Sequence, residues 1–314
     1  MTLMTPLPAG LVGAGRSRNG LGPYLATFLE RAGCRVTAIA GSSPARAEAN
    51  AAALSERLGH DVRPCRDLDE LCASGIAALV IASPPEHHLA ALEAAASARL
   101  PVLCEKPLVH EDHFASGTSV ISRFISSGLV LAENCHWPYV LPVLRELYGD
   151  VSFASVRHLS LGLGAVTSGR ALVQNTLSHL LSLAQAVGPV DAGTIADNVS
   201  CDRPSFSAPN VIRAHLRGPR MDLRLALHLD PFPNPPRPAW LEVDGARVDR
   251  RTAPGHTFSF SGNGREVPVS DPMQRLVFRF AESLRSPSPS CIAVEGEAVR
   301  QRLRLYRDIL SCLP

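Results

Sequence analysis

The chain has 314 residues, of which 46% are hydrophobic and 19% charged, and its formal net charge is +2. This length is typical of two domains, and the balanced charge argues against a nucleic-acid surface or a basic membrane patch. No apolar run reaches the ~18–20 residues of a membrane helix, and the first residues show no basic segment of a signal peptide. Eight scattered cysteines without C-x-x-C pairs predict buried thiols in a cytoplasmic protein and no metal site.

The first half of the chain alternates short apolar runs with helical patterns. We expect strands at 10–12, 34–40, 77–82 and 101–104, and helices at 21–33, 44–58, 68–73 and 87–99. The run at 77–82 is apolar throughout, as in strands that are buried on both faces of a parallel sheet. This order predicts an α/β domain with a doubly wound sheet, a Rossmann dinucleotide-binding domain, over residues 1–120.

The second half has a different rhythm, in which strands follow strands. We expect strands at 151–164, 210–217, 220–229, 238–243 and 256–261, and helices at 172–187, 275–284 and 295–310. The proline-rich stretch 230–238 is expected to be a loop, because proline cannot donate to a sheet ladder. Residues 121–314 are therefore predicted to form an α+β domain on an open, mostly antiparallel sheet.

A glycine turn follows the first expected strand. Gly13 and Gly15 lie between that strand and the next helix, where glycines let main-chain amides approach a pyrophosphate. The third glycine of a G-x-G-x-x-G motif would fall at Arg18, so this loop is enlarged. We expect Gly13, Gly15, Arg16 and Ser17 to bind a dinucleotide, although the motif is also compatible with an ordinary turn.

The end of the second strand bears on the choice of cofactor. NAD-binding domains commonly carry an acidic residue there, which binds the ribose 2′-hydroxyl. This chain instead has Ser42 and Ser43, with Arg46 shortly after. Hydroxyls and a guanidinium suit a 2′-phosphate, so NADP is the expected cofactor and NAD remains the alternative.

Lysine is nearly absent from the chain: Lys106 is the only lysine among 31 basic residues. It lies in the sequence Glu105-Lys106-Pro107 at the end of one expected strand, and Ser83-Pro84 ends the strand before it. Both turns are at carboxyl ends of parallel strands, where open α/β sheets bind ligands. We therefore expect Ser83, Pro84, Glu105 and Lys106 to contact the cofactor.

This arrangement resembles the Gfo/Idh/MocA oxidoreductase family, closely from residue 10 to about 110 and more loosely beyond. The resemblance implies that Lys106 is catalytic or polarises the substrate near the nicotinamide, with Glu105 in the same turn. It also implies a homodimer or homotetramer formed through the open sheet of the second domain. The chemistry suits a lysine, because an ammonium group exchanges a proton with a substrate oxygen and a guanidinium does so very poorly.

A second signature of that family is a helix with the pattern Asp-x-Gly-x-His-x-x-Asp. In this chain His179 matches the histidine, whereas Asn175 and Ser182 replace the aspartates and Leu177 replaces the glycine. The resemblance implies a catalytic role for His179, while Asn175 can bind a hydroxyl but cannot act as a base. A buried structural histidine is the competing interpretation of His179.

Asn134 and Trp137 lie where family members place a strand end near the substrate, so the resemblance implies that both bind substrate; packing is the alternative for Trp137. The predicted function is hydride transfer between NADP and a small carbohydrate-derived hydroxy or carbonyl compound. Two other readings stay open. One is a non-catalytic NAD(P)-binding regulator or scaffold of the same family, and the other is glycoside cleavage assisted by bound NAD.

Overall fold

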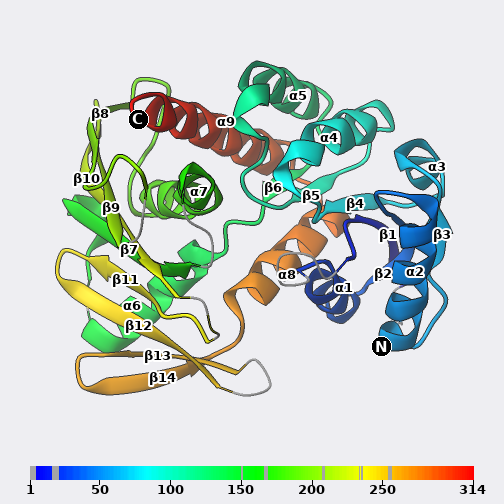
Figure 1. The fold of residues 1–314 in the computed structure, drawn as a ribbon, viewed down its shortest axis with the longest axis horizontal. Coiled ribbons are helices and arrows are strands. Elements are labelled where there is room, and N and C mark those ends of the chain that lie inside the picture. The colour runs from blue at the N-terminus through cyan, green and yellow to red at the C-terminus, as the bar shows by residue number, and fades with distance from the viewer. Residues whose placement is uncertain are drawn as a thin grey trace. The chain divides into compact units, whose positions relative to one another are not determined.

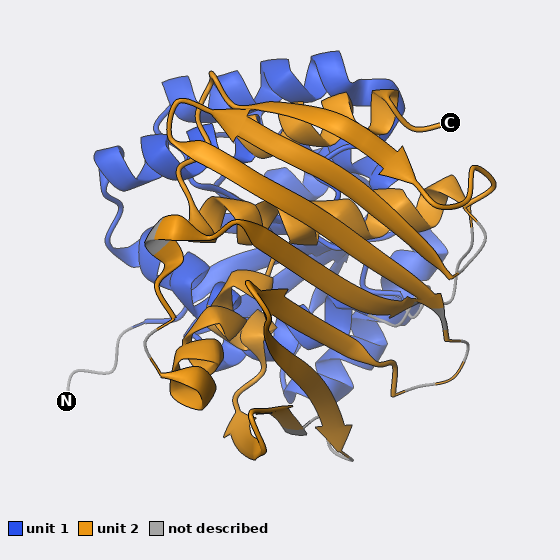
Figure 2. Cartoon of the chain, turned by 90° about the vertical axis from the view of Figure 1, so that its left-hand side faces the viewer, with its two compact units in different colours: residues 1–134, 276–300 blue, residues 135–275, 301–314 orange. Residues whose placement is uncertain are grey.

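The computed structural model describes residues 5–15, 21–149, 151–165, 169–206, 209–232, 234, 236–253 and 257–314. The chain forms two compact units, coloured separately in Figure 2. Unit 1 comprises residues 1–134 and 276–300, and unit 2 comprises residues 135–275 and 301–314. These units differ from the expected division at residue 120, because the chain adds one more strand to the first sheet after that point and later returns to unit 1.

Unit 1 is built on a six-stranded sheet, seen at the blue and cyan end of Figure 1. Its strands are β1 (Leu7–Val12), β2 (Cys34–Ala40), β3 (Arg63–Cys65), β4 (Ala78–Ile81), β5 (Val102–Cys104) and β6 (Leu131–Glu133). They lie in the order β3-β2-β1-β4-β5-β6, and every neighbouring pair is parallel. This is the strand order of a Rossmann sheet.

Helices connect and cover these strands. They are α1 (Leu21–Arg31), α2 (Pro44–Leu58), α3 (Leu68–Cys72), α4 (His88–Ser97) and α5 (Phe114–Ser126), with short 3-10 turns η2 (Pro85–His87) and η3 (Glu111–His113). All four residues of β4 are buried, as expected for a strand that is covered on both faces. The carboxyl ends of parallel strands meet at one edge, so the turns after β1, β2, β4, β5 and β6 share that edge.

Unit 1 also contains α8 (Pro272–Arg285) from Leu276 onward and the first part of α9 (Pro289–Ser311). The guanidinium of Arg285 donates a 2.7 Å hydrogen bond to the carbonyl oxygen of Ala32, directly before β2. This contact shows how a segment near the end of the chain is anchored to the first domain.

Unit 2 contains an eight-stranded sheet in the order β14-β13-β12-β11-β7-β10-β9-β8. The strands are β7 (His158–Ala165), β8 (Ile195–Cys201), β9 (Asn210–Gly218), β10 (Met221–Pro231), β11 (Ala239–Val243), β12 (Ala246–Ala253), β13 (Thr257–Gly262) and β14 (Arg265–Val269). Only the β7–β10 pair is parallel among these neighbours. The expected mostly antiparallel sheet is confirmed.

One face of this sheet is covered by α6 (Leu141–Tyr148), which packs on β12, β13 and β14, and by α7 (Arg170–Val187), which packs on β7 and β10. The short turns η4 (Trp137–Val140) and η5 (Phe153–Ser155) complete the elements of unit 2. Figure 2 looks onto the opposite face, where the described part of unit 2 places no helix. The expected open sheet is therefore present.

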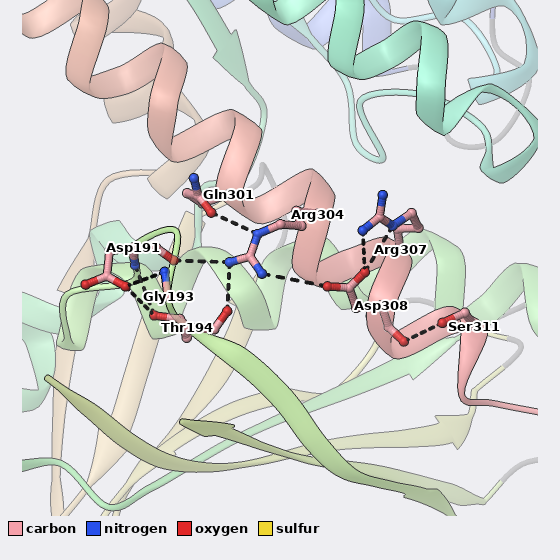
Figure 3. Close-up of polar contacts among 8 residues, drawn as sticks. All are labelled: Asp191, Gly193, Thr194, Gln301, Arg304, Arg307, Asp308 and Ser311. Carbon is pink, nitrogen blue, oxygen red and sulfur yellow. Dashed lines mark hydrogen bonds and ion pairs between the residues drawn. The ribbon is translucent and has the colours of Figure 1, made fainter. Parts of the chain in front are cut away.

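The last part of α9 is attached to the turn before β8 by Arg304 (Figure 3). Its guanidinium donates to the main-chain oxygens of Asp191 and Thr194, at 3.1 and 2.8 Å, and to the side chain of Gln301 at 3.0 Å. Asp308, one helical turn further on, lies 3.8 Å from the same guanidinium. One arginine thus satisfies two carbonyl oxygens of the turn before β8.

Several elements differ from the sequence expectations. The segment 114–148 contains α5, β6 and α6, for which no expectation was made, and β3, β8, β12 and β14 were also missed. The strand expected at 151–164 begins at His158, and β10 continues through Pro231 into the expected loop. Pro231 is tolerated because it is the last residue of the strand.

The cysteines follow the expectation only in part. All eight are free thiols, and Cys34, Cys65, Cys104 and Cys135 are buried. Cys72 and Cys201 are half-buried, and Cys291 and Cys312 are exposed, so the interpretation of all eight as buried apolar residues is wrong for the last two. No described group of three or more histidine, cysteine, aspartate or glutamate side chains could hold a metal ion. Every helix in the described part of the chain is too short or too polar to cross a membrane.

Candidate active site

The glycine turn after β1 makes a very close main-chain approach. Gly13 has a φ of +87°, and a Cβ atom there would lie 2.5 Å from the nitrogen of Ser83 and 2.7 Å from the oxygen of Ala82. Gly13 is therefore required both by its backbone conformation and by its contact with the turn after β4. A Cβ on Gly15, in contrast, would meet, among the described residues, only the side-chain amide nitrogen of Asn50, at 3.8 Å. The described residues thus leave space beside Gly15. Arg16 and Ser17 lie outside the described residues.

The third glycine of the motif has a counterpart that the spacing rule missed. A Cβ on Gly22, in the first turn of α1, would lie 2.6 Å from the carbonyl oxygen of Gly13. Close helix–strand packing is the task of the third glycine in dinucleotide-binding turns. The loop of this chain is longer, so that glycine falls at position 22 instead of 18. The signal was present in the sequence as a glycine one residue into the expected helix.

The turn after β2 places hydroxyls and a guanidinium together. Ser43 caps the N-terminus of α2, where its side-chain oxygen accepts from the main-chain nitrogen of Arg46 at 3.4 Å. The guanidinium of Arg46 lies 3.5 Å from the side-chain oxygen of Ser42. Ser42 and Arg46 are exposed and Ser43 is half-buried. The three residues expected to bind a 2′-phosphate are neighbours in space, at a helix N-terminus that itself favours anions.

The turn after β4 carries Ser83 and Pro84. The side-chain oxygen of Ser83 is buried and has no hydrogen-bond partner among the described residues. A buried hydroxyl without a hydrogen-bond partner destabilises the folded protein unless a ligand or water molecule provides that partner. Pro84 directly precedes the η2 turn, which leads into α4. Ser83 is therefore a donor or acceptor that is available at the sheet edge.

The Glu105-Lys106-Pro107 turn follows β5 at the same edge. Glu105 is buried, and burial raises the pKa of its carboxyl group, with the neighbouring Lys106 charge acting in the opposite direction. The side-chain amide of Asn134 donates a hydrogen bond to Glu105. Lys106 itself is half-buried. The turn thus presents its ammonium group beside a carboxyl group that is held in place.

The end of β6 supports that turn from a second side. The main-chain nitrogen of Asn134 donates to the carbonyl oxygen of Cys104 at 2.7 Å, which extends the β5–β6 ladder. Glu133 is buried and accepts a 3.1 Å hydrogen bond from the main-chain nitrogen of Leu108. Glu133 was not among the expected site residues. A carboxylate in an otherwise apolar strand was the signal that could have identified it.

The remaining predicted residues belong to unit 2. His179 lies on α7 and is buried, and its ring approaches the ring of His136 edge-on at 5.0 Å between centroids. Asn175 is half-buried, and its side-chain amide donates to the oxygen of Ala171 on its own helix at 2.8 Å. The hydroxyl of Ser182 likewise donates to the oxygen of His179, at 2.8 Å. Polar side chains therefore gather along α7 around a histidine pair.

Trp137 directly follows His136 in the chain, is the first residue of η4 and is only 2% exposed. Its ring packs edge-on against Phe260 at 6.4 Å between centroids, and the guanidinium of Arg250 lies 5.8 Å from the ring centre. These contacts account for its burial by packing inside unit 2. The structure thus brings five predicted residues to one edge of the first sheet: Gly13, Ser83, Glu105, Lys106 and Asn134. In unit 2, the ring of His136 contacts the rings of both His179 and Trp137.

Comparison with known proteins agrees with this geometry. Residues 7–134 match the family model described as "Oxidoreductase family, NAD-binding Rossmann fold", GFO_IDH_MocA. The chain is also 45% identical over 78 residues to inositol 2-dehydrogenase from Streptomyces avermitilis. That stretch covers 24% of this chain and 21% of the relative, about a fifth of the relative's length.

Solved structures resemble the chain over nearly its whole length. UDP-N-acetylglucosamine 3-dehydrogenase from Acidithiobacillus ferrooxidans gives a TM-score of 0.65 at 20% identity, covering 99% of this chain and 98% of the other. A variant of a 3-ketoreductase from Actinomadura kijaniata, in complex with TDP-benzene and NADP, gives 0.68 at 16% identity and 96% coverage of both chains. An oxidoreductase from Agrobacterium radiobacter with NAD+, L-tartaric acid and magnesium gives 0.64 at 16% identity, covering 96% and 94%.

These identities show a shared fold. Residues 7–134 are similar to the NAD-binding Rossmann domain of the Gfo/Idh/MocA oxidoreductases, in agreement with the expected resemblance, and the strand order confirms the expected fold class.

Proposed function

We propose that this protein transfers a hydride between a nicotinamide cofactor, NADP in preference to NAD, and a small carbohydrate-derived hydroxy or carbonyl compound. One observation carries the proposal: the only lysine of the chain lies in the turn after β5, at the sheet edge that also bears the glycine turn. Open parallel sheets bind their ligands at that edge. The lysine therefore lies where a reacting group is needed.

The residues at this edge fit a dinucleotide. Within the described part of the chain, Gly15 leaves room for a pyrophosphate, and the buried hydroxyl of Ser83 lacks a protein partner. Ser42, Ser43 and Arg46 would hold a 2′-phosphate, which supports NADP as the preferred cofactor. When bound, the nicotinamide supplies or accepts the hydride. The family model supports NAD-type binding in general, and the preference for NADP is our proposal.

The proton is assigned to Lys106. Moving a hydride to a carbonyl carbon requires a proton at the carbonyl oxygen, and the reverse reaction requires its removal. A lysine performs both tasks, because its ammonium form donates the proton and its neutral amine form accepts it, whereas arginine keeps its proton. Glu105 and Asn134 hold the turn through their mutual hydrogen bond, so that the ammonium keeps one orientation. We assign Glu105 and Asn134 to substrate binding as well. Glu105 directly precedes Lys106, and Asn134 follows the adjacent strand β6.

The unit 2 residues are assigned to the substrate. His179 would exchange a proton with a substrate oxygen or donate a hydrogen bond to it, and Asn175 would bind a hydroxyl. Trp137 is almost fully buried against Phe260, which supports a role in shaping the substrate wall by packing. Asn175 and Ser182 lack the carboxylates of family dehydrogenases, so Lys106 carries the acid–base step in this account.

We further propose that the open face of the unit 2 sheet joins copies of this chain into a homodimer or homotetramer. On that face the ring of Trp240 lies between His228, at 4.9 Å between centroids, and the guanidinium of Arg247, at 4.2 Å. Gly162 on β7 provides the space beneath, because a Cβ there would lie 2.0 Å from the indole nitrogen. Partly exposed tryptophan and arginine side chains are typical of interface centres.

The direct test is a spectrophotometric assay of cofactor oxidation or reduction with inositol, UDP-N-acetylglucosamine and simple sugars and ketoses. We expect wild-type turnover with at least one of these compounds, and a loss of about 10²–10⁴-fold in kcat for Lys106→Arg. Glu86→Gln, on the exposed η2 turn, is the control and retains activity.

Each contrary result of this assay identifies another reading. Full turnover by Lys106→Arg overturns the proton role. Saturable cofactor binding without turnover of any compound supports the non-catalytic regulator instead. Cleavage of a glycoside without net change in the cofactor absorbance supports the assisted-cleavage alternative.

A further inference from the structure

His88, the first residue of α4, bridges two of the turns that carry predicted site residues. Its side chain is completely buried, at 0% exposure. Its Nδ1 atom lies 2.9 Å from the carbonyl oxygen of Pro107, and its Nε2 atom lies 2.8 Å from the carbonyl oxygen of Ser83. One ring therefore contacts the turn after β5 and the turn after β4.

Both partners of this ring are acceptors. A carbonyl oxygen can only accept a hydrogen bond, and a neutral imidazole carries a single N–H. The imidazolium satisfies both carbonyl oxygens, whereas the neutral ring satisfies one of them and turns a lone pair to the other. Burial lowers the pKa of His88, and its main-chain contacts with Ser83, Pro107 and Leu108 and the charge of Glu133 act in the opposite direction. In either state at least one turn is held by the ring.

The turn after β5 is also attached to β4, on the other side of Lys106. Glu105 is tied to β4 by a hydrogen bond from its main-chain nitrogen to the oxygen of Ile81, at 2.8 Å. That bond lies before Lys106, and the His88–Pro107 contact lies immediately after it. Lys106 is thus bracketed, with one attachment to the sheet on its N-terminal side and one to α4 on its C-terminal side.

We propose that His88 is a positioning residue for Lys106: it ties the turn after β5 to the turn after β4 and so fixes the ammonium group relative to the predicted cofactor site. This inference rests on the proposed function for its catalytic meaning. It does not depend on that function for its test, because the position of the lysine can be measured without any substrate.

The sequence provides an unusually selective probe. Since Lys106 is the only lysine, protein produced with ¹³C-labelled lysine and a lysine-free tag yields one lysine side-chain signal in NMR. We would record this signal, and the rate at which Lys106 is acetylated, in the wild type, His88→Asn, His88→Gln and His87→Asn. His87 is exposed and precedes His88 in the chain, so His87→Asn is the matched control.

We expect the lysine signal and the acetylation rate of His87→Asn to match those of the wild type. His88→Asn, whose shorter amide cannot reach both carbonyl oxygens, shifts the lysine signal and increases acetylation several-fold. His88→Gln, with a longer amide, restores part of the wild-type behaviour. A folded His88→Asn protein whose lysine signal and acetylation rate match the wild type overturns the proposal, and so does an equal effect of His87→Asn.

If the His88 variants do not fold, the wild type still tests the inference. A ring N–H that is donated to a buried carbonyl oxygen is protected from exchange, so its proton remains observable in water. A ring proton of His88 that exchanges as fast as that of His87 overturns the proposal. The outcomes also separate the two claims: a lysine signal that depends on His88 in a protein without turnover retains the positioning role and rejects only the proposed function.

Discussion

Asn134 donates its side-chain amide to the buried carboxyl group of Glu105, and its main-chain nitrogen to the oxygen of Cys104, the residue before Glu105. These two bonds join the ends of β5 and β6 immediately before Lys106. The site lysine therefore extends from a turn that is fixed by neighbouring strands, and a positioned proton donor gains its effect from such fixed geometry.

Burial of Glu105 predicts a specific pH dependence of stability. Burial raises the pKa of Glu105 in the folded protein. The stabilising contribution of Glu105 to the free energy of unfolding is therefore present below the ordinary pKa of 4.5, and it is lost as the pH rises through the raised pKa. The glutamine of Glu105→Gln cannot ionise. As the pH rises above 4.5, the free energy of unfolding should therefore fall less in this variant than in the wild type. Urea unfolding at a series of pH values measures this difference.

The control for that series is Glu86→Gln, which replaces an exposed carboxyl group near the same sheet edge. Its stability should follow the wild type at every pH. If the curve of Glu105→Gln also runs parallel to the wild type, the carboxyl group of Glu105 is not buried as described.

Gly15→Ala separates folding from cofactor binding. In the described structure the added Cβ meets only Asn50, at 3.8 Å, so we expect an unchanged thermal midpoint. A pyrophosphate that approaches the main chain at this position would be obstructed, and the affinity for NADPH should fall at least tenfold, about 1.4 kcal/mol. Differential scanning fluorimetry and a fluorescence titration measure the two effects.

Gly13→Ala is the counterpart, because its Cβ would overlap the main chain of Ser83 and Ala82. It should lower the thermal midpoint of the free protein, unlike Gly15→Ala. Undiminished NADPH affinity in Gly15→Ala would show that no ligand approaches the glycine turn there.

The open face of the unit 2 sheet makes a prediction about assembly. Trp240→Glu places a charge between His228 and Arg247, and should dissociate an oligomer that is formed through this face. Sedimentation velocity of the wild type and the variant measures the change. Val294→Glu serves as the control, since Val294 is an exposed apolar residue of α9, at 69% exposure. An oligomer that dissociates only with Val294→Glu would move the interface away from the sheet.

Much of unit 1 was predictable because most of its strands coincide with short apolar runs that stand out from the helical patterns between them. β2 and α2 have the bounds that the sequence pattern predicts, and α2 begins at Pro44 after the serine cap at Ser43. β3 was missed because its three residues, Arg63 to Cys65, include a proline and two exposed positions. Such a strand is recognised only by its pairing with β2.

The same distinction applies to the site. The position of Lys106 and the glycines at one sheet edge could be predicted, because the strand-end turns of a parallel sheet share that edge. Glu133 could not be assigned its contact in advance, since it accepts from a main-chain atom of Leu108, and main-chain partners leave no trace in side-chain patterns. Gly22 was missed because a fixed motif spacing was applied to a longer loop.

The most direct test of the account is a fluorescence titration of the purified protein with NADPH and with NADH, in the wild type and in Arg46→Ala. The account predicts saturable binding of both cofactors by the wild type, with NADPH bound more tightly. In Arg46→Ala the affinity for NADPH should fall toward that for NADH, while the affinity for NADH stays unchanged. Tighter binding of NADH by the wild type would contradict the assignment of Ser42, Ser43 and Arg46. A folded protein that binds neither cofactor would contradict the proposed function itself.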